Sequence, residues 1–184
     1  MIRLFVGLAL PPPLRRHLAA MMAGLPGAHW VPEDNLHLTL RFIGEVDEPT
    51  AAAVDEGLAA IQGDAFELTI RGCGTFHSGR RPHTLWAGVE AAAPLLALQD
   101  KVDKAVMRAG LPADNRRFSP HIKLARLKDT PLPRLQAFVA GHNLLRETVW
   151  IDSFVLYSSL LGRGDPLYRA EADYPLNQDG GHGR

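Results

Sequence analysis

Two histidines in this sequence stand in strand-like segments, each beside a polar neighbour two positions on. His37 lies in the stretch NLHLTLRF and is followed by Thr39, while His121 lies in FSPHIKLAR and is followed by Lys123. In a strand, residues two apart point to the same side of the sheet. Each segment therefore presents an imidazole next to a hydroxyl or an ammonium group.

Two facing imidazoles can act as a general base and a general acid. The ordinary pKa of histidine is about 6.5, so near neutral pH one ring can be neutral while the other is protonated. Such a pair suits in-line displacement at phosphorus, because one ring takes a proton from the attacking hydroxyl and the other protonates the departing oxygen. Thr39 and Lys123 would bind the phosphoryl oxygens as these gain charge. One such segment alone is more typical of a solvated strand face, so the interpretation depends on the presence of both.

A metal site is the main competing use of histidines. It needs several ligands on one centre, commonly completed by carboxylates or thiolates. Asp34 precedes His37 by three residues but belongs to a loop, and His121 has no His, Asp or Glu within four residues. The single cysteine, Cys73, excludes an internal disulfide and is expected to be a small buried residue. Neither a metal nor another cofactor is predicted.

Composition limits the partners and the compartment. The 20 Lys and Arg residues balance the 20 Asp and Glu residues, so no overall field attracts nucleic acid or acidic membranes. An anionic substrate must instead be held by a local cluster. The apolar start MIRLFVGLAL breaks on three prolines and is too short to span a bilayer. We expect a cytoplasmic monomer without membrane contact.

The chain reads as two copies of one unit, covering about residues 1–76 and about residues 84–176. In the first copy RLFVGLAL corresponds to LWAGV in the second, and the helical stretch that follows contains GLP in both. An aromatic residue and a proline precede each histidine strand. Corresponding positions are offset by 81 residues at the first strand and by 84 at the two histidines. Such a near-constant offset indicates a duplication.

A single β-α-β-α-β unit is too small to bury its apolar faces, so the two copies must pack together. We predict an α+β fold with one bilobal domain over residues 1–176, its copies related by a pseudo-two-fold axis. Antiparallel sheets would line a central groove with the helices outside, and His37 and His121 would face each other across it. The second copy is predicted to end in one strand, residues 148–161, and residues 177–184 to be a flexible tail.

On this scaffold the paired motifs resemble the two-histidine phosphoesterase superfamily, and within it the RNA 2′,3′-cyclic phosphodiesterase family, also called 2′-5′ RNA ligase. The likeness runs from RLFVGLAL to LYRAEADYPL and includes HLTL, RFIGEV, LWAGVE and FSPHIKLAR. It implies metal-free hydrolysis of a terminal RNA 2′,3′-cyclic phosphate to a 2′-phosphate, and weak, reversible joining of RNA ends. RNA ends that carry this cyclic phosphate are the expected partner.

The resemblance also implies roles for single residues. His37 resembles the proton donor of the family and His121 the proton acceptor, in roles that can exchange with the direction of reaction. Thr39 would bind a phosphate oxygen, and Arg126 matches a family arginine near the phosphate. Lys123 is a departure, because it stands where the family has Thr or Ser. An ammonium there is a mobile point charge that also opposes protonation of a nearby imidazole.

Further residues are candidates for contact with the rest of the RNA. Phe42 can stack on a base, although an aromatic residue in a strand is more often part of the core. Arg80 and Arg81 lie in HSGRRPH, predicted to be a mobile basic turn that joins the two lobes. They would hold RNA phosphates beyond the reacting end by charge, with a plain solvated loop as the alternative. Surface roles are expected for His17, His29 and His142.

Two other functions stay open. One is a non-catalytic module that binds RNA ends or nucleotides, in which Lys123 prevents turnover. The other is a phosphoesterase for a small cyclic nucleotide such as ADP-ribose 1″,2″-cyclic phosphate. The presence of both histidines favours catalysis, and the basic stretch HSGRRPH mildly favours RNA.

Overall fold

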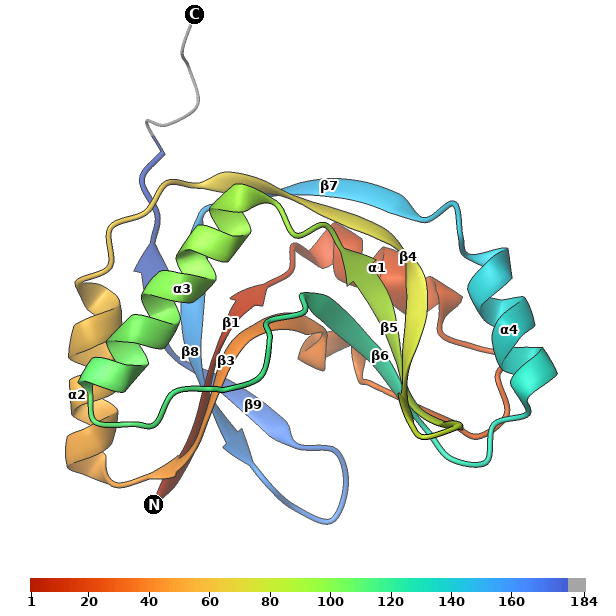
Figure 1. Ribbon diagram of the computed structural model, residues 1–184, viewed down its shortest axis with the longest axis horizontal. Helices are drawn as coiled ribbons and strands as arrows, with labels where there is room; N and C mark the ends of the chain where they lie inside the picture. The colour runs from red at the N-terminus through yellow and green to blue at the C-terminus, as the bar shows by residue number, and fades with distance from the viewer. Residues whose placement is uncertain (179–184) are drawn as a thin grey trace, which may run out of the picture.

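The computed structural model describes residues 1–178, which form four α-helices and nine strands in two antiparallel sheets (Figure 1). The strands are β1 (Ile2–Ala9), β2 (Ala28–Trp30), β3 (His37–Val46), β4 (Phe66–Ser78), β5 (Arg81–Val89), β6 (His121–Leu127), β7 (Arg146–Ile151), β8 (Ser153–Leu160) and β9 (Leu167–Pro175). The helices are α1 (Pro12–Met21), α2 (Glu48–Ala59), α3 (Ala93–Arg108) and α4 (Leu132–Gly141), with a 3₁₀ turn at Glu33–Asn35. The predicted α+β class is confirmed.

The order of the strands shows the duplication. One sheet runs β3-β1-β8-β9 and the other β2-β6-β5-β4-β7. If β1 corresponds to β5, β3 to β6 and β8 to β4, the triplets β3-β1-β8 and β6-β5-β4 are equivalent. Each triplet takes its third strand from the other copy, because β4 belongs to the first half of the sequence and β8 to the second. The two sheets therefore do not coincide with the two halves of the sequence.

Local sequence explains how the elements begin and what they bury. Each of the four α-helices in residues 1–178 has a proline in its first turn, where a missing N–H costs nothing. The apolar run of β1 is buried from Leu4 to Leu8 because this strand lies between β3 and β8. Gly7 allows the close approach to β3, since a Cβ there would lie 2.8 Å from the carbonyl oxygen of Leu38.

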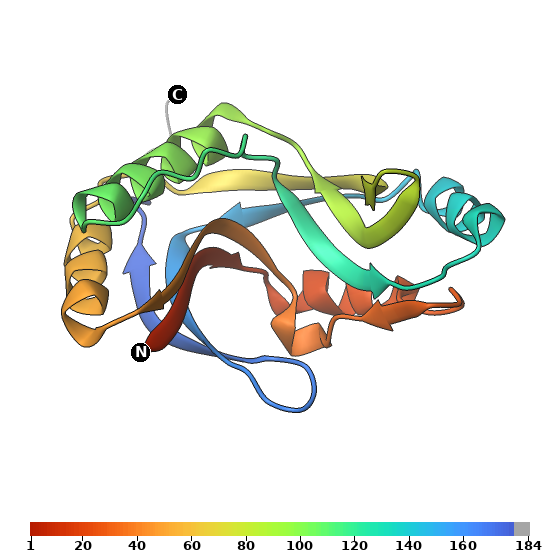
Figure 2. The ribbon, with the colours of Figure 1, turned by 60° about the horizontal axis from the view of Figure 1, so that its bottom comes forward.

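The helices lie outside the sheets, as predicted. Helices α2 and α3 pack against each other at one end of the molecule, and α4 packs on β4 at the other (Figures 1 and 2). The two sheets meet where β3 lies beside β6, so the two histidine strands are neighbours. No helix in residues 1–178 is long and apolar enough to cross a membrane.

Two predictions about connections are wrong. The strand expected over residues 148–161 is two strands, β7 and β8, which separate at Asp152 and enter different sheets. The segment HSGRRPH does not join two lobes, because it forms the tight hairpin between β4 and β5 within one sheet. Gly79 has a φ of +61° there, in the left-handed region that this turn requires.

The first two residues of the predicted tail, Asn177 and Gln178, have contacts with the domain. Asn177 donates its backbone N–H to Gly63 and accepts a bond from Ala65, each at 2.8 Å, and the side chain of Gln178 accepts from Trp150 at 3.3 Å. Both residues are thus bonded to the domain. The rest of the predicted tail, residues 179–184, lies outside the described residues.

Candidate active site

The two histidines occupy the first positions of β3 and β6 and are held in the same way. The Nδ1–H of His37 donates to the carbonyl oxygen of Asn35 at 2.7 Å, and that of His121 to Ser119 at 2.8 Å. Each acceptor lies two residues before its histidine. In a neutral ring this bond keeps the proton on Nδ1 and leaves Nε2 as the basic nitrogen. The duplication has thus produced two imidazoles with the same orientation relative to their strands.

Both imidazoles line one cavity of about 310 Å³, called the catalytic cavity below. Six of the eight residues predicted for the site line it: His37, Thr39, Phe42, His121, Lys123 and Arg126. The hydroxyl oxygen of Thr39 lies 2.8 Å from Nε2 of His37, so the hydroxyl donates to this nitrogen when the ring is neutral. The cavity thus combines two imidazoles with a hydroxyl and two cations, a set of groups suited to bind and transform a phosphate ester.

A bulge in each histidine strand explains how two of these residues reach the cavity. Pairing with the neighbouring strand shifts by one residue at Leu40 in β3 and at Leu124 in β6. After the shift, Phe42 and Arg126 join the faces of His37 and His121, although each follows its histidine by five residues. Phe42 is 58% exposed as a result, so its alternative assignment to the core does not hold.

The surroundings of the His37 ring favour its neutral form. The ring is buried against Phe5, Tyr157 and Tyr168, with centroid distances of 4.9, 6.1 and 5.3 Å. Burial lowers the pKa of His37 below its usual value, and the nearby positive charges of His121 and Lys123 lower it further. The bond to the Asn35 carbonyl opposes these effects but is outweighed. Near neutral pH the free protein therefore holds His37 uncharged.

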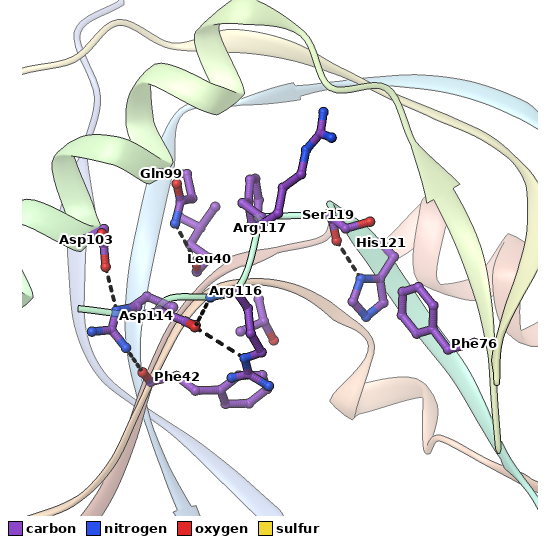
Figure 3. Close-up of a pocket in the computed structure, with 13 residues that line it drawn as sticks. Leu40, Phe42, Phe76, Gln99, Asp103, Asp114, Arg116, Arg117, Ser119 and His121 are labelled. Atoms are coloured by element: carbon purple, nitrogen blue, oxygen red, sulfur yellow. Dashed lines mark hydrogen bonds and ion pairs between the residues drawn. The ribbon is translucent and has the colours of Figure 1, made fainter. Parts of the chain in front are cut away.

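His121 has a more open setting. Its ring meets Phe76 edge-on at 4.8 Å, as Figure 3 shows, and lies 6.5 Å from the ring of Trp86. Trp86 is also the partner of Lys123 across the β5–β6 pairing. Burial lowers the pKa of Lys123, and the neighbouring Arg126 adds to this effect. Lys123 thus points into the cavity on the same side as His121.

The remaining two predicted residues, Arg80 and Arg81, do not line the catalytic cavity. They lie at the tip of the β4–β5 hairpin, whereas His121 pairs with Gly88 at the other end of β5. Seven residues separate Arg81 from Gly88, which corresponds to roughly 20 Å along a strand. Arg126, which pairs with Thr84, lies between them. Arg126 and then Arg81 and Arg80 thus lie at increasing distance from His121 along the β5–β6 pairing and the β4–β5 hairpin.

One wall of the catalytic cavity comes from the loop between β8 and β9, which sequence reasoning missed. Asp165 in this loop accepts a bond from Nε2 of His29 at 2.8 Å, and the carbonyl of Pro166 accepts from Asn35 at 2.8 Å. His29, expected to have a surface role, thus lies at the rim of the cavity. More than 130 residues separate these partners, so no local pattern in the sequence could have shown the contact.

A second cavity of about 320 Å³ adjoins the catalytic cavity (Figure 3). Thr39, Phe42 and His121 line both, whereas the loop between α3 and β6 supplies the opposite wall. In this loop Asp114 accepts bonds from the backbone N–H and the Nε–H of Arg116, at 3.0 and 3.2 Å. These bonds lower the pKa of the Asp114 carboxyl. The nearness of Arg116 to FSPH in the sequence was a signal that could have been used.

The wall of the second cavity is anchored by Arg41, a buried residue of β3. Its guanidinium donates to Asp103 at 2.7 Å, to the carbonyl of Phe42 at 2.8 Å and to the carbonyl of Pro112. Arg41 therefore ties β3 to helix α3 and to the loop that precedes His121. Within residues 1–178 there is no group of three or more His, Cys, Asp or Glu side chains placed to hold a metal ion.

Comparison with known proteins agrees with the fold. The chain is 38% identical to an RNA 2′,3′-cyclic phosphodiesterase of Aeropyrum pernix over 147 residues, which cover 76% of this chain and 81% of the relative. It is 29% identical to one of Escherichia coli over 184 residues, covering 96% and 97%. The apo crystal structure of E. coli LigT superposes with a TM-score of 0.80 at 27% identity, covering 96% of this chain and 98% of that one.

A family model matches the chain twice in succession, at residues 8–86 and 88–168. These two consecutive matches agree with the duplication that the strand orders of the two sheets show. This model is described as LigT like phosphoesterase, and the chain belongs to that family.

Proposed function

We propose that this protein hydrolyses the 2′,3′-cyclic phosphate at the end of an RNA strand to a 2′-phosphate, without a metal ion. The observation that carries this proposal is the pair of imidazoles in one cavity, each fixed through Nδ1 and each with Nε2 available for proton transfer. The names of the relatives from A. pernix and E. coli support the choice of substrate. The family resemblance supports metal independence.

In the proposed reaction Nε2 of His121 takes a proton from a water molecule, whose oxygen attacks phosphorus. The bond from phosphorus to O3′ breaks, and a protonated His37 gives its Nε2 proton to O3′. The products are a 2′-phosphate and a free 3′-hydroxyl. Thr39, Lys123 and Arg126 bind the non-bridging oxygens, which gain negative charge as the attack proceeds.

The donor role of His37 needs a charged ring, although the free protein holds this ring neutral. A bound phosphate brings a negative charge next to the imidazole and favours its protonated form. The reverse assignment, with His37 as the acceptor, agrees with the free state. A substrate with a p-nitrophenolate leaving group separates the two, because this group departs without a proton. If His37 is the donor, His37→Ala should lose much less activity on the aryl ester than on the RNA substrate.

The direct test is incubation of an oligonucleotide that ends in a cyclic phosphate, in the presence of EDTA. We expect hydrolysis at the same rate with and without the chelator, and a product that carries the phosphate on O2′. Loss of activity in EDTA, restored by zinc or manganese, would refute the metal-free mechanism. Tight binding without turnover would favour the non-catalytic alternative. Preference for ADP-ribose 1″,2″-cyclic phosphate over the oligonucleotide would favour the small-substrate alternative.

We also propose that Phe42 stacks on a base and that Arg80 and Arg81 hold phosphates further along the RNA. Phe42 is exposed next to the imidazoles, and the hairpin arginines continue the direction set by Lys123 and Arg126 along the sheet.

A further inference from the structure

The tautomer of the neutral His37 ring is decided at Nδ1. The Thr39 hydroxyl on Nε2 can donate as well as accept, so it is compatible with a proton on either ring nitrogen. The carbonyl oxygen of Asn35 on Nδ1 can only accept, at 2.7 Å. This carbonyl therefore determines that Nδ1 carries the proton and that Nε2 is the basic nitrogen.

The Asn35 carbonyl belongs to a short turn with little support of its own. Asn35 is the last residue of the 3₁₀ turn Glu33–Asn35, and the two residues before it, Glu33 and Asp34, are exposed. Hydrogen bonds in 3₁₀ turns have poorer geometry than those in α-helices. The direction of the Asn35 carbonyl consequently depends on what else holds this residue.

The side chain of Asn35 makes the additional contact. Its Nδ2 donates to the carbonyl oxygen of Pro166 at 2.8 Å, in the loop between β8 and β9. This loop is exposed over residues 161–165 and projects from the sheet (Figures 1 and 2). Two residues after Pro166, the ring of Tyr168 meets the His37 ring edge-on at a centroid distance of 5.3 Å. Asn35 thus holds the imidazole with its backbone and the β8–β9 loop with its side chain.

The imidazole of the second copy has a separate support. The Nδ1–H of His121 donates to Ser119, in the loop between α3 and β6. Arg41 anchors that loop by donating to the carbonyl of Pro112. The support of one imidazole can therefore be removed while that of the other stays in place.

We propose that Asn35 is a positioning residue: its side-chain bond to the β8–β9 loop keeps His37 in the tautomer and orientation that proton transfer at Nε2 requires. The inference rests on the proposed function, in which His37 exchanges a proton with an oxygen on phosphorus. Asn35 acts through His37 and takes no part in the bond changes. Without the bond to Pro166 the turn can rotate, Nδ1–H loses its acceptor, and the neutral ring can carry its proton on Nε2 instead.

Nitrogen NMR of the free, full-length protein tests the orientation directly. In Asn35→Ala the fraction of neutral His37 with its proton on Nε2 should rise, whereas the tautomer of His121 should stay as in the wild type. Asn35→Gln keeps an amide donor and should restore part of the wild-type ratio. The control is Asn143→Ala, which removes an exposed amide in the turn after α4.

Kinetics separate positioning from a general loss of structure. On an oligonucleotide with a cyclic phosphate end, Asn35→Ala should lower kcat roughly tenfold, the size expected for one hydrogen bond, while KM changes by less than about twofold. In a His37→Ala background the same substitution should change kcat by less than about twofold, because no ring is left to orient.

Several results would overturn the inference. One is an unchanged His37 tautomer in Asn35→Ala, or a shift of the same size in Asn143→Ala. Another is an equal fall in kcat with and without the His37 ring. A rise in KM at constant kcat would assign Asn35 to substrate binding instead. A wild type that does not hydrolyse the cyclic phosphate would refute the proposed function, yet NMR of the free protein would still decide whether Asn35 orients His37.

Discussion

The buried guanidinium of Arg41 gives a prediction whose size follows from its contacts. The side chain is 9% exposed and reaches Asp103, whose side chain is 24% exposed, at 2.7 Å. Replacing Arg41 by Met keeps an apolar stem of similar length and removes the charge together with its three bonds. The carboxylate of Asp103 and two backbone carbonyls then lose their donors.

Breaking a buried ion pair by removing one partner costs roughly 3–5 kcal/mol. Asp103 keeps some contact with water, which solvates the orphaned carboxylate, so we expect the lower end, about 3 kcal/mol in the free energy of unfolding. For a domain of this size that corresponds to a fall of roughly 6–12 °C in Tm. Adding Asp103→Leu removes the orphaned charge. The double variant should therefore be more stable than the sum of the two single losses implies, by at least about 1 kcal/mol.

The same helix supplies a matched control. Lys104 and Asp100 of α3 also form an ion pair at 2.7 Å, but both side chains are 58% exposed. Lys104→Met should cost less than about 0.5 kcal/mol, because exposed helical pairs contribute little. Urea denaturation of all variants measures the difference. If Arg41→Met destabilises the protein no more than Lys104→Met, or if the coupling energy between Arg41 and Asp103 is zero, burial does not make the Arg41–Asp103 ion pair important for stability.

Arg41→Met should also lower the catalytic rate. The loop that it holds contains Ser119, whose carbonyl accepts the Nδ1–H of His121. A looser loop allows the imidazole to rotate away from the reactive position, so kcat should fall by about tenfold under conditions where the variant is still folded. Unchanged kcat would mean that β6 alone fixes the His121 ring.

Three further predictions concern the catalytic groups and the RNA. His37→Ala and His121→Ala should each lower turnover of the RNA substrate by roughly 10²- to 10⁴-fold. The double variant should lose little more activity than the less active single variant, because the two imidazoles act as a unit. Near-normal turnover in either single variant would exclude an acid–base pair. Lys123→Thr removes one cause of the low pKa of His37, so this pKa should rise. In the pH profile of kcat/KM, the alkaline limb should then move to higher pH if His37 is the proton donor, and the acid limb should do so if His37 is the proton acceptor. If neither limb moves, the Lys123 ammonium lies too far from the imidazoles to affect them. Removing Arg80 and Arg81 together should reduce the dependence of RNA binding on salt by about two phosphate contacts, and an unchanged slope would leave the hairpin a solvated loop.

Much of the fold was predictable because the duplication is visible in the sequence. The apolar run after Met1 indicated a buried strand, and prolines marked the helix starts. The division of residues 148–161 was not predictable, because β7 and β8 are separated by Asp152 alone. Whether a strand continues or passes to the other sheet depends on which neighbours have an open edge, and this is a tertiary property. The same holds for β4, which pairs with strands from the second half.

The site was predictable where it depends on spacing along a strand. Alternation placed Thr39 beside His37 and Lys123 beside His121, and all four line one cavity. Alternation alone would put Arg41 on the solvent side, with His37, and Phe42 on the leucine side. The bulge at Leu40 reverses both, so Arg41 is buried and Phe42 is exposed. No sequence pattern near residue 40 indicates this bulge, since it arises from the pairing with β1.

The bulges also explain how a symmetric scaffold forms an asymmetric site. Phe42 and Arg126 occupy equivalent positions, five residues after the two histidines, and the equivalent bulges bring both to the catalytic cavity. Thr39 and Lys123 are equivalent in the same sense. The first copy therefore contributes a hydroxyl and an aromatic ring, and the second contributes two cations. Because aromatic rings attract bases and cations attract phosphates, the differences between the copies set the direction in which RNA can lie. Exchange of Phe42 and Arg126 in a double variant should consequently weaken RNA binding, although both side chains would still face the cavity.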